Sequence, residues 1–101
     1  MKPDRKAAIF PGSFDPFTLG HMDVLRSALK LFDKIYIAVG YNHLKHGFLP
    51  PQTRVALIQD AVRPLIEGGA DIEVLSYTGL TVNLCREKNT GFIIRGLRTT
   101  T

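Results

Sequence analysis

Residues 7–21 read AAIFPGSFDPFTLGH, a stretch that combines a short apolar run, a tight loop and a helix start. The run Ala7–Phe10 predicts a strand buried on both faces, because its apolar residues are continuous rather than alternating. Gly12, set among prolines, indicates a loop whose backbone can approach a ligand closely. Gly20-His21 then opens a helix, whose free N–H groups and partial positive charge attract phosphate. The stretch therefore predicts a strand–loop–helix unit with an anion site at its turn.

The same alternation continues along the chain. Three further apolar runs predict buried strands at Ile35–Val39, Ile72–Leu75 and Phe92–Ile94. The order strand-helix-strand-helix-strand-helix-strand predicts an α/β fold, a doubly wound Rossmann-like parallel sheet with helices on both faces. We expect residues 1–101 to form one domain. Ligands of such sheets bind beyond the carboxyl ends of the strands, so the segments after each strand are the ones to inspect.

Apolar periodicity indicates three helices between these strands. The first has an apolar face that repeats at spacings of 3, 4 and 3 and is widened by neighbouring positions: Met22, Leu25, Leu29 and Phe32, with Val24, Ala28 and Leu31. The second is expected from Thr53, its N-cap, to about Leu65, before Gly68-Gly69. Its inward face is expected to consist of Val55, Ile58, Ala61, Val62 and Leu65. The third covers about Leu80–Lys88, with Val82, Leu84 and Cys85 apolar.

Composition narrows the class of protein. The net charge is 13 − 9 = +4, and apart from Arg95 and Arg98 the basic residues are scattered rather than gathered along one face, which disfavours nucleic acid. Two interpretations stay open: an ordinary solvated basic surface, and a protein that binds phosphate-bearing small molecules. No apolar run approaches the ~18–20 residues that cross a bilayer, and the first residues lack the apolar core of a signal peptide. Cys85 is the single cysteine, as expected for the reducing cytoplasm. We expect a cytoplasmic protein with no membrane partner.

Polar residues follow each predicted strand at one edge of the sheet. They are Ser13, Lys45, Thr81 and Arg95. Two positive charges and a helix N-terminus at one edge suit two phosphate-bearing substrates. Taken singly, His21 is typical of an ordinary residue at a helix start, and Lys45 and Arg98 are typical of solvated surface charges. His43 and His46 have no carboxylate or cysteine spaced to complete a metal site, so we predict no protein ligand for a metal.

Two motifs add a resemblance to these residues. Ser13-Phe14-Asp15-Pro16 followed by Thr18-Leu19-Gly20-His21 resembles the (H/T)xGH signature of the nucleotidyltransferase superfamily, in the form found in phosphopantetheine adenylyltransferases. Ile94-Arg95-Gly96-Leu97-Arg98 is similar to a second motif of that family, one that related cytidylyltransferases lack. The resemblance runs from about Ala7 to Arg98. It implies transfer of the adenylyl group of ATP to 4′-phosphopantetheine, giving dephospho-coenzyme A and pyrophosphate, with Mg²⁺, in a hexamer.

The resemblance also implies catalytic roles for matching residues. The phosphate of the acceptor attacks the α-phosphorus of ATP in line, so no covalent enzyme intermediate is expected. His21 would stabilise the transition state at the α-phosphate. Lys45 would follow the acceptor phosphate as a mobile charge, and Arg95 would hold that phosphate with its planar fork.

Further residues are implied to bind the two substrates. Ser13 would contact both phosphates through its hydroxyl, and Phe14 would offer its backbone N–H to ATP. His21 and the run Gly96, Leu97 and Arg98 would complete the ATP site, with Arg98 on the triphosphate. Thr81 stands where the family usually has an apolar residue against the pantetheine arm, which is a departure from the pattern.

Alternatives remain at this point. One is another nucleotidyltransferase of the same fold, acting on glycerol phosphate with CTP or on nicotinamide mononucleotide with ATP. The other is a non-catalytic module that binds phosphate ligands or nucleic acid, which the charge of +4 and the short length of 101 residues permit. Relatives are expected to continue for about sixty residues beyond Thr101, so the domain is expected to be incomplete at its C-terminus.

Overall fold

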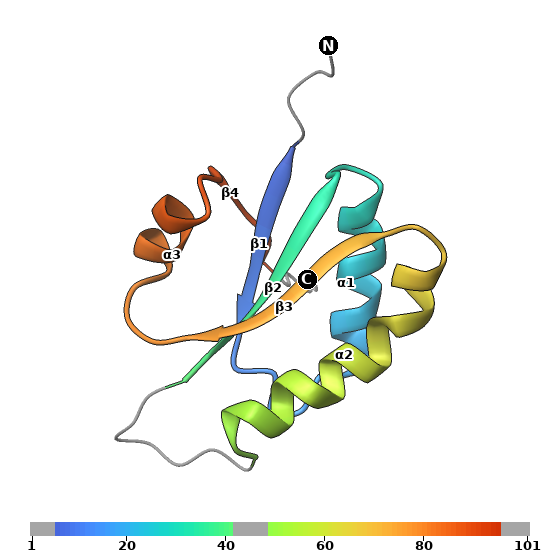
Figure 1. Ribbon diagram of the computed structural model, residues 1–101, viewed down its shortest axis with the longest axis horizontal. Helices are drawn as coiled ribbons and strands as arrows, with labels where there is room; N and C mark the ends of the chain where they lie inside the picture. The colour runs from blue at the N-terminus through green and yellow to red at the C-terminus, as the bar shows by residue number, and fades with distance from the viewer. Residues whose placement is uncertain (1–5, 42–48, 96–101) are drawn as a thin grey trace, which may run out of the picture.

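A computed structural model describes residues 6–41 and 49–95 of the chain. Four parallel strands form one sheet in the order β3-β2-β1-β4, and three helices connect them (Figure 1). The strands are β1 (Ala7–Gly12), β2 (Lys34–Gly40), β3 (Asp71–Tyr77) and β4 (Phe92–Ile93), and the helices are α1 (Leu19–Leu29), α2 (Pro51–Glu67) and α3 (Thr81–Glu87). Helices α1 and α2 cover one face of the sheet and α3 covers the other (Figure 1). The predicted doubly wound α/β fold is confirmed.

The register brings the carboxyl ends of three strands to one edge. Strand β1 pairs with β2 from Ala7 opposite Lys34 to Gly12 opposite Val39, and β2 pairs with β3 along its whole length. Strand β4 adds a short ladder on the other side of β1. The loops that follow the strands therefore leave from the same edge, where parallel α/β sheets bind their ligands.

The core lies on both sides of the sheet because successive strand residues point to opposite faces. Beneath α1 and α2, the buried cluster comprises Ala8, Phe10, Phe14, Leu25, Ala28, Ile35, Ile37, Val39, Ile58 and Val62. Beneath α3, a smaller cluster comprises Ile9, Ala38, Leu84 and Cys85. Buried continuous runs in β1 and β2 confirm that these strands are covered on both faces.

The start of α2 corrects one prediction. The N-cap is Pro50, not Thr53, and its side chain makes no capping hydrogen bond. Pro51 occupies the first helical position, where a missing N–H costs nothing and a fixed φ suits the helix. Gly68 is the C-cap, as predicted. Ala61, predicted to face inward, is exposed.

The prediction of a buried fourth strand is wrong in part. The sequence predicts that Phe92–Ile94 is buried, but Phe92 is 48% exposed and Ile93 is 44% exposed. The reason is position: in the described part of the chain, β4 pairs with β1 alone and forms an edge of the sheet. Leu31 and Val82, expected on apolar helix faces, are also exposed. None of the helices in the described ranges is long and apolar enough to cross a membrane.

Candidate functional site

The loop from β1 to α1 is built around Phe14. This residue is 2% exposed and has a φ of 48°, a left-handed conformation that bulky side chains rarely adopt. Its ring lies across Gly12, where a Cβ would stand 3.0 Å from the ring atom Cζ. Glycine is thus needed at position 12 because the ring occupies the space of a side chain. The Asp15–Pro16 peptide that follows is cis.

Burying Phe14 creates an aromatic seat for His21. The imidazole centroid lies 4.9 Å from the Phe14 ring and 5.4 Å from the Phe17 ring, on which it stacks. Phe10 meets the same group from β1, with centroids 5.2 Å from Phe14 and 6.3 Å from His21. The histidine ring is therefore held by side chains from the strand and the loop, and its position is fixed before any ligand arrives.

Hydrogen bonds at the start of α1 set the orientation of the same ring. Thr18 is the N-cap, and its hydroxyl accepts the His21 backbone N–H at 3.3 Å. In return His21 Nδ1 accepts the Thr18 backbone N–H at 2.9 Å and lies 3.0 Å from Thr18 Oγ1. This is a capping box in which histidine takes the place of the usual Glu or Gln.

That geometry fixes where the proton of the neutral ring sits. Because Nδ1 of His21 accepts an N–H, the neutral imidazole carries its proton on Nε2 and can donate from there. Partial burial lowers the pKa of His21 below its usual value, which favours this neutral form at pH 7. The arrangement can offer a hydrogen-bond donor to an anion at a helix N-terminus.

Two other predicted site residues, Ser13 and Arg95, lie at the same edge of the sheet as His21. Ser13 follows β1 and is exposed. Arg95 is exposed after the neighbouring β4, whose pairing extends through the Ile94 N–H, which donates to the Ile9 carbonyl at 2.8 Å. Ser13 and Arg95 therefore lie beyond the carboxyl ends of adjacent strands.

Thr81 is set apart from these residues. It begins α3, after β3, and its Oγ1 lies 2.8 Å from the hydroxyl of Tyr77. Strand β2 separates β3 from β1 in the sheet, so Thr81 is not adjacent to Ser13. The remaining predicted site residues, Lys45, Gly96, Leu97 and Arg98, lie outside the described residues.

Sequence reasoning gave no role to Arg54, which the structure places beneath the loop. Among the described residues, Arg54 is the one polar or charged residue that is buried, with 5% of its surface exposed. The sequence does indicate that Arg54 is buried: residues 54, 58 and 62 are spaced four apart and share one face of the helix, on which Ile58 and Val62 are buried too. An arginine in that row indicates a buried charge with specific partners.

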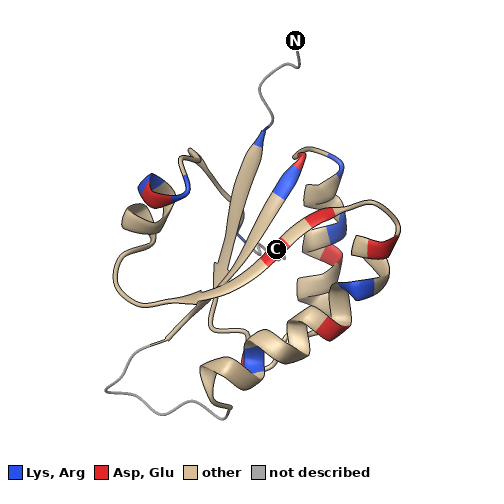
Figure 2. Cartoon of the chain, viewed as in Figure 1, with Lys and Arg blue, Asp and Glu red and all other residues tan. Residues whose placement is uncertain are grey.

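Within residues 6–41 and 49–95, the Lys and Arg side chains do not gather into one basic surface. Figure 2 shows Lys and Arg spread over the helices and the starts of β1 and β2, with Asp and Glu among them. Lys34, for example, lies 3.4 Å from carboxylate oxygens of both Asp71 and Glu73. In the ranges that the structure describes, no three His, Cys, Asp or Glu side chains are grouped to hold a metal ion.

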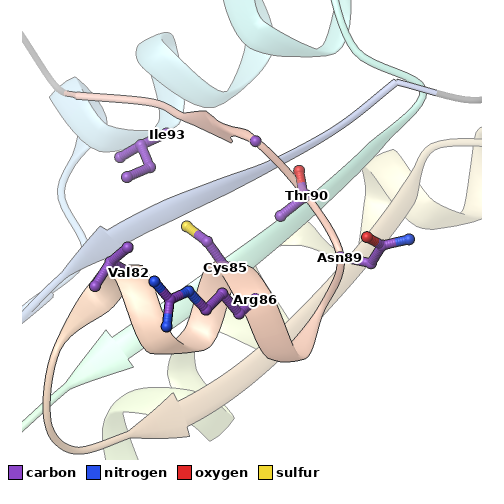
Figure 3. A pocket seen from close by; sticks show the side chains of 7 residues that line it. Val82, Cys85, Arg86, Asn89, Thr90 and Ile93 are labelled. Carbon is purple, nitrogen blue, oxygen red and sulfur yellow. The ribbon is translucent and has the colours of Figure 1, made fainter.

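A separate pocket of about 460 Å³ lies between α3 and β4. Figure 3 shows Val82 and Cys85 of α3 and Ile93 of β4 facing the same space. Thr90 at its rim donates to the carbonyl of Ala7, the first residue of β1, which places this rim at the amino edge of the sheet. Of the residues predicted to bind phosphate, the three that the structure describes, Ser13, His21 and Arg95, do not line this pocket.

The loop after β1 and the parallel sheet lie in the part of the chain that is similar to known proteins. The family model described as cytidylyltransferase-like matches residues 9–101. Phosphopantetheine adenylyltransferase of Christiangramia forsetii is 43% identical over 93 residues, which cover 92% of this chain and 59% of that protein. The protein of the same name from Leptospira biflexa strain Patoc 1 is 43% identical over 97 residues, covering 96% of this chain and 58% of the relative. That from Cytophaga hutchinsonii is 44% identical over 96 residues, covering 95% and 61%.

The chain thus spans about three-fifths of the length of these relatives, from 58% to 61%. The matched residues 9–101 include β1 from Ile9 onward, the capped start of α1 and the other three strands of the sheet. With nearly its full length matched, the chain belongs to the cytidylyltransferase-like family.

Proposed function

We propose that this protein transfers the adenylyl group of ATP to 4′-phosphopantetheine, giving dephospho-coenzyme A and pyrophosphate. The relatives that match at 43–44% identity carry the name phosphopantetheine adenylyltransferase. The observation that carries the proposal is the His21 ring, seated on Phe14 and Phe17 and bonded through Nδ1 to Thr18, at the N-terminus of α1. It supports a site made to receive phosphate.

In the proposed reaction an oxygen of the acceptor phosphate attacks the α-phosphorus of ATP. A new phosphorus–oxygen bond forms there as the bond to the bridging oxygen of the β-phosphate breaks, and pyrophosphate leaves. The Nε2–H of His21 donates to an α-phosphate oxygen, where negative charge must be stabilised. The N–H groups at the start of α1 add a fixed positive potential. Catalysis is then positioning and charge stabilisation, with no protein nucleophile.

Other residues complete the proposed site. Ser13 contacts the substrate phosphates through its hydroxyl, Phe14 offers its backbone N–H to ATP, and Arg95 holds the acceptor phosphate. Lys45 follows the acceptor phosphate, while Gly96, Leu97 and Arg98 line the ATP site. Thr81, whose Oγ1 lies 2.8 Å from the Tyr77 hydroxyl, is assigned to the pantetheine arm.

Magnesium, oligomeric state and compartment belong to the same proposal. Mg²⁺ arrives with ATP, whose triphosphate oxygens hold it and whose charge it neutralises. The family resemblance implies a hexamer in the cytoplasm. Sedimentation of the purified protein tests the assembly, since a hexamer of this 11.2 kDa chain is well separated from a monomer or dimer.

The test is pyrophosphate release by the purified protein with ATP, Mg²⁺ and 4′-phosphopantetheine. The control pairs are CTP with glycerol phosphate and ATP with nicotinamide mononucleotide. Release that needs both ATP and phosphopantetheine supports the proposal. Release only with a control pair means that the acceptor is wrong, and binding of DNA or RNA without any release favours a non-catalytic module.

A further inference from the structure

Arg54 links the start of α2 to the loop after β1. It lies in the first turn of the helix, where its backbone N–H donates to the Pro50 carbonyl at 3.0 Å. Its side chain leaves the helix and donates from Nη1 to the carbonyl of Ser13 at 2.8 Å. Nε donates to the carbonyl of Leu49 at 2.9 Å. One guanidinium thus bonds two backbone segments 36 positions apart in the chain, since 49 − 13 = 36.

A second contact closes the same bridge. The backbone N–H of Leu49 donates to Asp15 Oδ1 at 2.9 Å. Leu49 is therefore held at both its N–H and its carbonyl, by Asp15 from the loop and by Arg54 from the helix. Figure 1 shows the loop after β1 passing beside the start of α2, where these bonds are made.

The chemistry of arginine suits this place. Both acceptors of the Arg54 guanidinium are neutral backbone carbonyls. The side chain is 5% exposed, so its donors are lost from water and must be satisfied by these bonds. A planar fork can serve two carbonyls at once, whereas the ammonium of lysine is a single point. The positive charge also stays close to the loop that is proposed to receive phosphate.

We propose that Arg54 is a positioning residue for the phosphate-binding loop, holding the Ser13 carbonyl so that the Ser13 hydroxyl and the Phe14 N–H face the substrates. This assignment rests on the proposed adenylyl transfer. Arg54 itself is proposed to touch no substrate. It acts through the backbone of Ser13, where a displacement of about 1 Å can cost up to about 100-fold in rate.

The experiment compares Arg54→Gln with Arg63→Gln, a control on the same helix whose exposed side chain pairs with Asp60 at 2.7 Å. Two quantities are measured: kcat and KM for pyrophosphate release, and the amide hydrogen-exchange rates of Leu49 and Ile37 by NMR. For Arg54→Gln we expect kcat to fall by about tenfold or more with a much smaller change in KM. We expect the ratio of the Leu49 rate to the Ile37 rate to rise by about tenfold, because the bridge opens locally. Arg63→Gln should change neither.

The proposal requires both the fall in kcat and the rise in the ratio of the two exchange rates. A purely stabilising Arg54 would speed exchange at the core residue Ile37 as much as at Leu49, leaving the ratio unchanged and overturning the proposal. An unchanged kcat in a folded variant would also overturn it. If Arg54→Gln does not fold, Arg54→Lys takes its place: it keeps the charge but not the fork, and the same two changes are expected. Absence of pyrophosphate release by the unaltered chain would refute the proposed function for this chain, while the exchange ratio still decides whether Arg54 holds the loop.

Discussion

Replacing His21 with glutamine separates its two roles, at the helix start and in chemistry. In a capping box the third helical position is normally Glu or Gln, whose side chain accepts the N-cap N–H. The amide oxygen of a glutamine at this position can therefore take over the bond that His21 Nδ1 now makes with the Thr18 N–H at 2.9 Å. Glutamine lacks the ring contacts at 4.9 and 5.4 Å with Phe14 and Phe17, so its amide N–H₂ is not held where the imidazole holds its donor.

The magnitudes follow from those contacts. Losing the aromatic packing costs about 0.5–1.5 kcal/mol, which His21→Gln and His21→Ala share. Losing the hydrogen bond to the Thr18 N–H costs about a further 0.5–1.5 kcal/mol, in the alanine variant alone. At about 4–8 °C per kcal/mol for a domain of this size, His21→Gln should melt roughly 2–12 °C above His21→Ala.

Turnover should behave differently from stability. Alanine has no donor, and the amide donor of glutamine is not held in place by Phe14 and Phe17, so both variants should lose about 10²–10³ in kcat. The assays are thermal unfolding by circular dichroism and pyrophosphate release at a temperature where both variants are folded. Full turnover in His21→Gln would refute the role of the imidazole as a donor. Equal melting temperatures for the two variants would refute the capping role.

Three further predictions concern pH, the loop glycine and the core. Burial lowers the pKa of His21, so just below pH 6.5 the unfolded chain binds more protons than the folded one. The stability present at pH 7.5 should therefore fall as the pH drops through the lowered pKa of His21. Melting temperature measured against pH checks this, and His21→Gln should flatten the curve. Gly12→Ala forces the Phe14 ring to move and should cost about 1–3 kcal/mol in urea unfolding, whereas Gly91→Ala, with open space around its Cβ, should be nearly neutral. Ile58→Ala should cost about 2–5 kcal/mol because Ile58 is fully buried, whereas the control Leu57→Ala at an exposed neighbour should stay within about 0.5 kcal/mol.

The sheet was predictable from sequence because its central strands are continuous apolar runs. Ile35–Val39 is buried or half-buried at every position, which is the pattern that favours a strand covered on both faces. Phe92–Ile94 is also a continuous apolar run, and yet β4 lies at an edge of the sheet in the described part of the chain. Composition reports the preference of a segment for burial, but which strands become neighbours is decided by the whole topology, and no local pattern contains that information.

Helix boundaries were missed for a local reason. Thr53 is a favourable N-cap residue, but Pro50-Pro51 starts the helix first, with Pro51 pre-set for the first helical position. Two start signals stood three residues apart, and propensity alone does not rank them. The same shift moved Arg54 from the predicted start of the helix into its first complete turn, where its side chain can reach back to the loop.

The candidate site shows what motif and geometry each contribute. The motif placed Ser13 and His21 at the carboxyl edge of β1, but it did not reveal that Phe14 is buried beneath the histidine or that Thr18 holds Nδ1. These contacts make one residue serve both the helix start and the proposed chemistry. A histidine whose Nδ1 is occupied by the backbone has only one nitrogen left to offer, and the helix that it caps fixes where that nitrogen lies. Stability and donor orientation are therefore coupled at His21, and a substitution that repairs only the cap should restore the first without the second.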